Sequence, residues 1–250
     1  MAAKTMTLDA LVAQLTHVHG DALQAVVLYG SAASGEDIAG RSDLNVLAIV
    51  HTMSLASLRA LGQTMRAWQE AGHPPVLELT TAEWVSSADV FPMEYADILE
   101  RHRVLAGSLP LEGVTVSLSD LRLQVEQEAM GKLLRLRRGV MLAGTDIDRQ
   151  QELLRASLST LLVIFRGVMR LQGDVPPRDS ARVIAAVSAR CGFPAEPFER
   201  VLAYKRGSAM PSGDTERVLE GYVEGMTALV AYLNRFQLPG QAIIAGLLPQ

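Results

Sequence analysis

The sequence predicts an α+β protein, with a mixed β-sheet and helices in the first part of the chain and an all-α helical bundle in the second. Two observations predict this division. Short apolar runs rich in β-branched residues occur before residue 110, whereas only long patterns of helical periodicity follow residue 118. A turn-rich connection, Pro110 to Gly113, separates the two kinds of pattern. We therefore expect two domains, over residues 1–112 and 113–250.

The N-terminal part alternates short apolar runs with amphipathic patterns. Short continuous runs with β-branched residues are typical of buried strands, and apolar residues at helical spacing are typical of helices packed on a sheet. Two strands joined through a crossover helix imply a mixed sheet. The expected elements are a helix that follows Thr7 and ends at Gly20, strands over 25–29, 43–50 and 76–81, and a helix from Leu58 to Trp68.

The rest of the chain is predicted to be largely helical. A further helix opens at Phe91-Pro92, and residues 104–106 add a short strand. Long helices are then expected from Ser119 to about Gly144 and from Asp146 to about Gly173, followed by two or three more. Because the connections between the long helices are short, the helices should lie antiparallel in a bundle.

Composition narrows the class of protein. The chain has 250 residues, of which 49% are hydrophobic and 20% charged, and its net charge is −4. An acidic chain lacks the cationic field that drives non-specific duplex binding, so a nucleic-acid partner is not expected. The single cysteine, Cys191, rules out an internal disulfide, and no secretory segment is visible. We expect a cytoplasmic protein without a membrane span.

The strongest candidate site joins two neighbouring strands. Gly30 and Ser31 follow the strand over 25–29, and Asp43 and Asn45 open the strand over 43–50. A glycine without a Cβ lets backbone N–H groups approach phosphate oxygens, and the serine hydroxyl adds a donor. Side chains at i and i+2 share one face of a strand, so Asp43 and Asn45 could hold a metal ion together.

Glu78 is the third candidate. It lies inside the apolar run Val76 to Thr80, and strand alternation puts it on the opposite side from Leu77 and Leu79. An acid on a covered sheet face needs a charge partner or a raised pKa, whereas an acid on an open face is simply solvated. We expect Glu78 to point into the same cleft as Asp43 and Asn45.

These residues resemble the motifs of the nucleotidyltransferase superfamily, which includes DNA polymerase beta and the aminoglycoside nucleotidyltransferases. The family pattern is Gly-Ser, a short spacer, Asp-x-Asp on the next strand, and a third carboxylate on a later strand. Gly30, Ser31 and Asp43 match it, and Glu78 matches the third carboxylate. Asn45 stands where the family has its second Asp. The resemblance covers roughly residues 20–82.

The resemblance implies transfer of a nucleoside monophosphate from ATP or another nucleoside triphosphate to a hydroxyl of a small molecule, with Mg²⁺ as cofactor. It implies Asp43 and Glu78 as catalytic residues, and Gly30, Ser31 and Asn45 as nucleotide-binding residues. The implied metal ligands are Asp43, Asn45 and Glu78. Because Asn45 removes one negative charge between two dications, the transfer would be weak or lost.

Other interpretations remain open. The chain could be a non-catalytic nucleotide-binding or regulatory module that works through protein contacts, or a plain α+β protein with a chance motif. The sequence leaves the roles of two groups of basic residues open. Arg166 interrupts an apolar helix, and the basic run Lys132, Arg135, Arg137 and Arg138 forms either a solvated face or a contact for a triphosphate or an acidic substrate. The sequence does not determine the acceptor, the preferred base or the oligomeric state.

Overall fold

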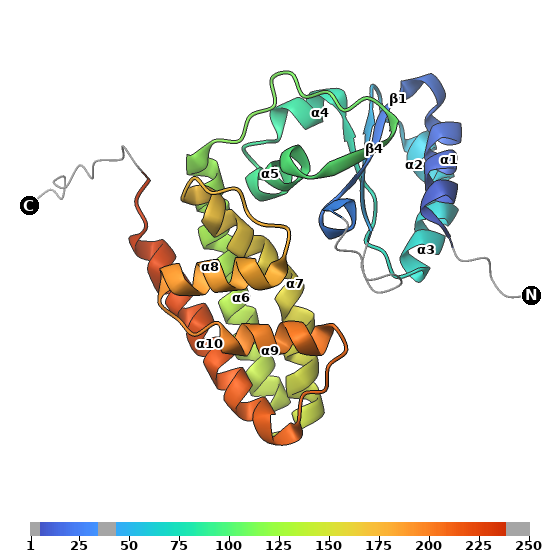
Figure 1. Ribbon diagram of the computed structural model, residues 1–250. Helices are drawn as coiled ribbons and strands as arrows, with labels where there is room; N and C mark the ends of the chain where they lie inside the picture. Colours follow the sequence, from blue (N-terminus) through green and yellow to red (C-terminus); the bar gives the residue numbers. More distant parts are fainter. Residues whose placement is uncertain (1–5, 35–43, 239–250) are drawn as a thin grey trace, which may run out of the picture. The chain divides into compact units, whose positions relative to one another are not determined.

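A computed structural model describes residues 6–34 and 44–238 of the chain (Figure 1). Its contacts divide the chain into two compact units, the first through Ser117 and the second from Leu118. The boundary expected after residue 112 falls in the connection between the last strand of the first unit and the first helix of the second.

The first unit is built on a four-stranded sheet in the order β3-β2-β1-β4. Strand β1 is antiparallel to both β2 and β4, whereas β2 and β3 are parallel. The parallel pair requires a crossover, which helices α2 and α3 supply. The bounds are β1 Leu23–Tyr29, β2 Asn45–Val50, β3 Leu77–Thr80, β4 His102–Gly107, α2 Leu55–Ala60 and α3 Gly62–Glu70.

Helices cover both faces of this sheet (Figure 1). On one face, which we call the α1 face, α1 (Leu8–His19) and α3 bury Trp68 against the strands. On the other, the α5 face, α4 (Thr81–Ser86) and α5 (Pro92–Glu100) contribute Trp84 and Tyr95. The central strands alternate between them. Val26, Leu28, Val46 and Ala48 enter the α1 face, and Ala25, Val27, Leu47 and Ile49 enter the α5 face.

The structure confirms the mixed sheet and the first helix. Helix α1 follows Thr7, whose side-chain oxygen accepts a hydrogen bond from the Ala10 N–H at 3.2 Å, and it ends at Gly20. Two details differ. The helix expected from Leu58 to Trp68 is two helices that meet at Leu61, and α4 was not expected, because it spans only six residues.

In the second unit, the described residues 118–238 form helices joined by loops and contain no strand, as predicted. Its helices are α6 Leu118–Ala143, α7 Ile147–Leu171, α8 Ser180–Cys191, α9 Glu196–Lys205 and α10 Ser212–Arg235. Asp146 caps α7 by accepting from the Arg149 N–H at 3.1 Å. Across the described part of the chain, no helix combines the length and the apolar character needed to span a membrane.

Aromatic rings form the core where α7, α9 and α10 meet. The Phe198 ring lies 4.5 Å from that of Tyr222 and 5.6 Å from that of Phe165. Gly225 of α10 lets this cluster close, because a Cβ added there would lie 2.5 Å from Cε2 of Phe198. The close approach of α10 and Phe198 therefore depends on a missing side chain.

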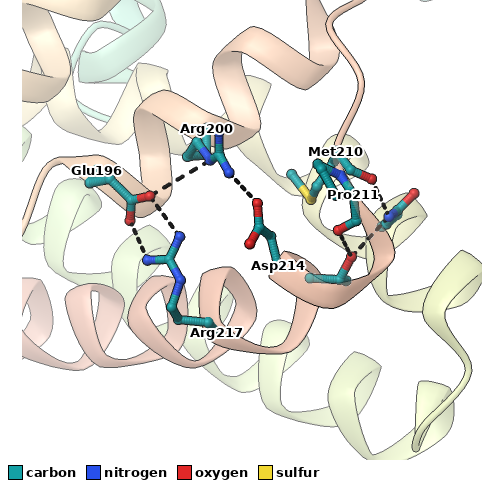
Figure 2. A network of polar contacts seen from close by, with 8 residues as sticks. Glu196, Arg200, Met210, Pro211, Asp214 and Arg217 are labelled. Atoms are coloured by element: carbon teal, nitrogen blue, oxygen red, sulfur yellow. Dashed lines mark hydrogen bonds and ion pairs between the residues drawn. The ribbon is translucent and has the colours of Figure 1, made fainter.

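Ion pairs on the surface of the second unit join α9 to α10 (Figure 2). Arg217 donates two hydrogen bonds of 3.0 Å to the Glu196 carboxylate, and this contact lowers the Glu196 pKa. Arg200 reaches Glu196 at 3.7 Å and also contacts Asp214. Because these groups are largely exposed, solvent screens them, and the network orients the two helices more than it stabilises them.

Two glycines of α10 make a matched test of this packing. Gly225→Ala should lower the free energy of unfolding by about 1–2 kcal/mol, because overpacking against Phe198 outweighs the better helix propensity of alanine. Gly213→Ala should be neutral or raise it by up to about 1 kcal/mol, because nothing lies within 4 Å of its added Cβ. Urea unfolding of both variants checks this, and equal effects would contradict the packing described.

Candidate functional site

Gly30 forms a tight turn at the end of β1. Its φ of 76° lies in the left-handed region that favours glycine, and its carbonyl accepts a hydrogen bond from the Ala33 N–H at 3.2 Å. A short 3-10 helix, Ser31–Ser34, follows directly. A Cβ added to Gly30 would lie 3.1 Å from Nδ2 of Asn45. The conformation therefore favours glycine, a Cβ would crowd the Asn45 side chain, and the turn lies against Asn45.

Asn45 is the first residue of β2 and pairs with Tyr29 of β1. It has the same parity as Leu47 and Ile49, so its side chain lies on the α5 face. The residue before it is also held in place, since the Leu44 N–H donates to Nδ1 of His73 at 3.3 Å. The start of β2 is thus fixed beside the Gly30 turn. Asp43 lies outside the described residues, so its role stays a prediction.

The structure does not bring Glu78 together with Asn45. Glu78 pairs with Ala48, whose side chain enters the α1 face, and its Oε1 lies 3.2 Å from Nε2 of His19. Burial raises the pKa of Glu78, and the His19 charge and hydrogen bond oppose this. The prediction that Glu78 points into the same cleft as Asn45 is therefore wrong. The parallel register of β3 gives the α5 face to Leu77 and Leu79 and leaves Glu78 as the buried partner of His19.

The described residues do not bring together Asn45 and Glu78, two of the three magnesium ligands that the resemblance implies. Asn45 offers a neutral amide oxygen, and the Glu78 carboxylate is held on the other side of the sheet. Among residues 6–34 and 44–238, no group of three or more histidine, cysteine or acidic side chains could hold a metal ion. Of the two implied ligands that the structure describes, Asn45 lies beside the Gly30 turn and Glu78 does not.

Other polar side chains, which the sequence motifs did not indicate, gather beside Asn45. His102, Tyr29 and Asn45 are cross-strand neighbours in one row of the α5 face. Nδ1 of His102 lies 2.7 Å from the Ile98 carbonyl, so an N–H at Nδ1 leaves Nε2 as an acceptor. Nearby carboxylates on α5 add negative charge to this row.

The pKa of Tyr29 reflects the burial and the negative charge around this row. Burial raises its pKa, and the charges of Glu94 and Asp97 raise it further. A sequence signal for this group existed. Tyr29 directly precedes Gly30, and Glu94 and Asp97 are three residues apart on a short helix, which places them on one side of it.

The basic run and Arg166 lie in the second unit. Lys132 is half-buried, and burial followed by the Arg135 charge lowers its pKa. Arg135 reaches Glu128 at 3.5 Å, whereas Arg137 and Arg138 are exposed on α6. Arg166 is buried in α7. The basic run is thus a largely solvated helix face, and its role as a ligand contact stays a prediction.

Comparison with known proteins supports the fold. No protein-family model matches the chain, and no curated protein sequence matches it. Among solved structures, it is similar to the spectinomycin adenyltransferase AAD(9) of Enterococcus faecialis, determined with ATP and spectinomycin. The TM-score is 0.56 at 16% identity, and the match covers 88% of this chain and 96% of that one. The chain therefore has an aminoglycoside nucleotidyltransferase-like fold, as its motifs indicated.

Proposed function

We propose that this protein binds a nucleoside triphosphate at the Gly30 turn and transfers its nucleoside monophosphate to a hydroxyl of a small molecule. The observation that carries the proposal is the left-handed Gly30 turn packed against Asn45 at the edge of a transferase-like sheet. The solved structure of similar fold, a spectinomycin adenyltransferase, holds ATP and spectinomycin. A cytoplasmic location, where ATP is plentiful, is part of the proposal.

The turn has the properties of a phosphate cradle. The chain leaves the central strand β1 at Gly30 and enters a short 3-10 helix, so the backbone N–H groups of this turn lie at the end of β1. Such groups bind anions well, provided that no Cβ blocks the approach of the phosphate oxygens. The β- and γ-phosphates are the groups expected to lie there.

The transfer reaction also needs a base. The acceptor oxygen bonds to the α-phosphorus, the bond from that phosphorus to the bridging oxygen breaks, pyrophosphate leaves, and the hydroxyl proton must go to an acceptor. Glu78 faces His19 on the opposite side of the sheet and is not aligned for this step. Among the described residues, we propose Nε2 of His102 on the α5 face as the proton acceptor, because an N–H at Nδ1 bound to the Ile98 carbonyl leaves Nε2 with a free lone pair.

A second candidate function is a nucleotide-binding module without transfer. Two observations at the implied metal ligands favour it. Asn45 is neutral where the family has an acid, and Glu78 contacts His19 on the other face of the sheet. Such a protein would bind the nucleotide at the same turn and would act through contacts with other proteins.

Replacing Gly30 tests nucleotide binding. Gly30→Ala should weaken ATP binding by at least about tenfold, because the added Cβ lies 3.1 Å from the Asn45 side chain and crowds the turn. Gly192→Ala is a matched control, because Gly192 has the same φ of 76° and nothing lies within 4 Å of its added Cβ. Isothermal titration with ATP, with and without Mg²⁺, provides the measurement. If both variants lost ATP affinity equally, a general effect of backbone strain, and not the Gly30 turn, would explain the loss.

Asn45→Asp separates the two candidate functions. In a weakened transferase, the new carboxylate restores charge at the implied metal position, so Mg²⁺-dependent ATP binding and nucleotidyl transfer should each rise by about tenfold or more. We expect this outcome. It is measured by ATP titration and by pyrophosphate release in the presence of hydroxylated acceptors.

The same variant can also favour the module. Without a metal ion, a new carboxylate at the strand end adds like-charge repulsion and should lower the melting temperature. A variant that is destabilised to the same extent with and without Mg²⁺ and ATP, and that releases no pyrophosphate, would refute the transferase and leave nucleotide binding as the function.

A further inference from the structure

Helix α6 has two apolar faces, and only one of them packs inside the second unit. The buried face consists of Leu121, Val125, Ala129, Leu133, Leu136 and Ala143. On the opposite side, four apolar side chains are exposed. The exposed fractions are 66% for Leu123, 39% for Met130, 43% for Leu134 and 74% for Met141.

These exposed residues follow the spacing of a coiled-coil seam. The four are separated by seven, four and seven residues, and with the polar residues Gln127 and Arg137 between them the steps alternate between four and three, which is the heptad pattern of helices that pack side by side. Two exposed polar residues occupy the remaining positions of the pattern. The α6 seam is defined as Leu123, Gln127, Met130, Leu134, Arg137 and Met141. Four of the six seam positions are apolar, and a largely apolar stripe on a protein surface indicates an interaction site.

We propose that the α6 seam binds the α6 seam of a second copy of this chain, with the two helices antiparallel about a twofold axis. The order of residue types identifies the partner, because the seam has the same pattern from either end. Apolar residues then lie opposite apolar residues, and the polar pair is matched as well. The pairs across the axis are Leu123 with Met141, Gln127 with Arg137, and Met130 with Leu134.

The antiparallel direction follows from the charges. In a parallel pair, Arg137 would lie opposite Arg137 of the other copy, and the two guanidiniums would repel each other inside the contact. In the antiparallel pair, each Arg137 lies opposite a Gln127, whose amide oxygen can accept a hydrogen bond from the guanidinium. The seam contains no acidic residue that would favour an arginine-rich partner of another kind.

The size of the seam predicts a weak dimer. From Leu123 to Met141 the helix is roughly 27 Å long at about 1.5 Å per residue, and a single helix pair buries less surface than a stable dimer requires. Self-association should therefore depend on concentration. Sedimentation equilibrium of the full chain over roughly 1–500 μM covers the range of such contacts.

Charge placement at the centre of the seam tests both the partner and the register. Met130→Glu alone, or Leu134→Lys alone, puts an unpaired charge opposite an apolar side chain and should weaken dimerisation at least about tenfold. The double variant Met130→Glu/Leu134→Lys puts each new acid opposite a new lysine and should restore the dimer. In a parallel pair, the double variant would face acid with acid and lysine with lysine, and the dimer would not return.

Val175→Glu is the matched control, because Val175 is 80% exposed and lies outside α6. Its mass distribution should equal that of the wild type, and circular dichroism should show native helix content for all four variants. A wild-type chain that is monomeric throughout the concentration range would overturn the proposal. So would a dimer that neither single variant weakens, and a double variant that stays monomeric would overturn the antiparallel register.

Discussion

The side chains of β1 and β2 alternate between two buried clusters, and this alternation decides which polar groups can meet. Because helices cover both faces of these central strands, every residue along them must enter either the α1 face or the α5 face. Polar side chains are tolerated where a strand ends or where a partner is buried with them. Asn45 is an example of the first case, and Glu78 with His19 is an example of the second.

The alternation also explains what the sequence could and could not predict. The strands and long helices were predictable, because β-branched runs and helical periodicity are local properties. The opposite orientations of Glu78 and Leu77 within β3 were predictable for the same reason. Which face Glu78 occupies was not, because it depends on the parallel register between β2 and β3, and the α2–α3 crossover sets that register from outside both strands.

Under the proposed function, the candidate site would combine a turn that binds the nucleotide with an altered set of catalytic groups. The Gly30 turn needs only local geometry, and Gly30 and Asn45 provide it together. Catalysis in the implied family needs carboxylates from separate strands on one face of the sheet. Whether they share a face depends on the register in which the strands pair. A chain can keep the turn and lose the register, and the proposed ligand at the turn would then lie beside the row of His102, Tyr29 and Asn45.

In the second unit, the side of helix α6 on which a residue lies likewise decides whether it is buried in the bundle or exposed on the surface. One side of α6 is buried within the bundle, and the seam on the other side has the spacing of a second packing surface. A helix with two apolar stripes is unusual for a solvated surface, where a single stripe satisfies the core. In the proposed dimer, Arg137 lies within the contact between the two copies, and the exposed Arg138 lies at its border.

The central claim is that a nucleotide at the Gly30 turn lies on the α5 face, away from Glu78. Proton–carbon NMR of the histidine rings during titration with ATP tests it most directly, with each signal assigned by substitution. ATP should shift the His102 signal, because His102 is in the row with Tyr29 and Asn45, and should leave the His19 signal in place. A shift of His19 without a shift of His102 would contradict the account and would return Glu78 to the nucleotide site.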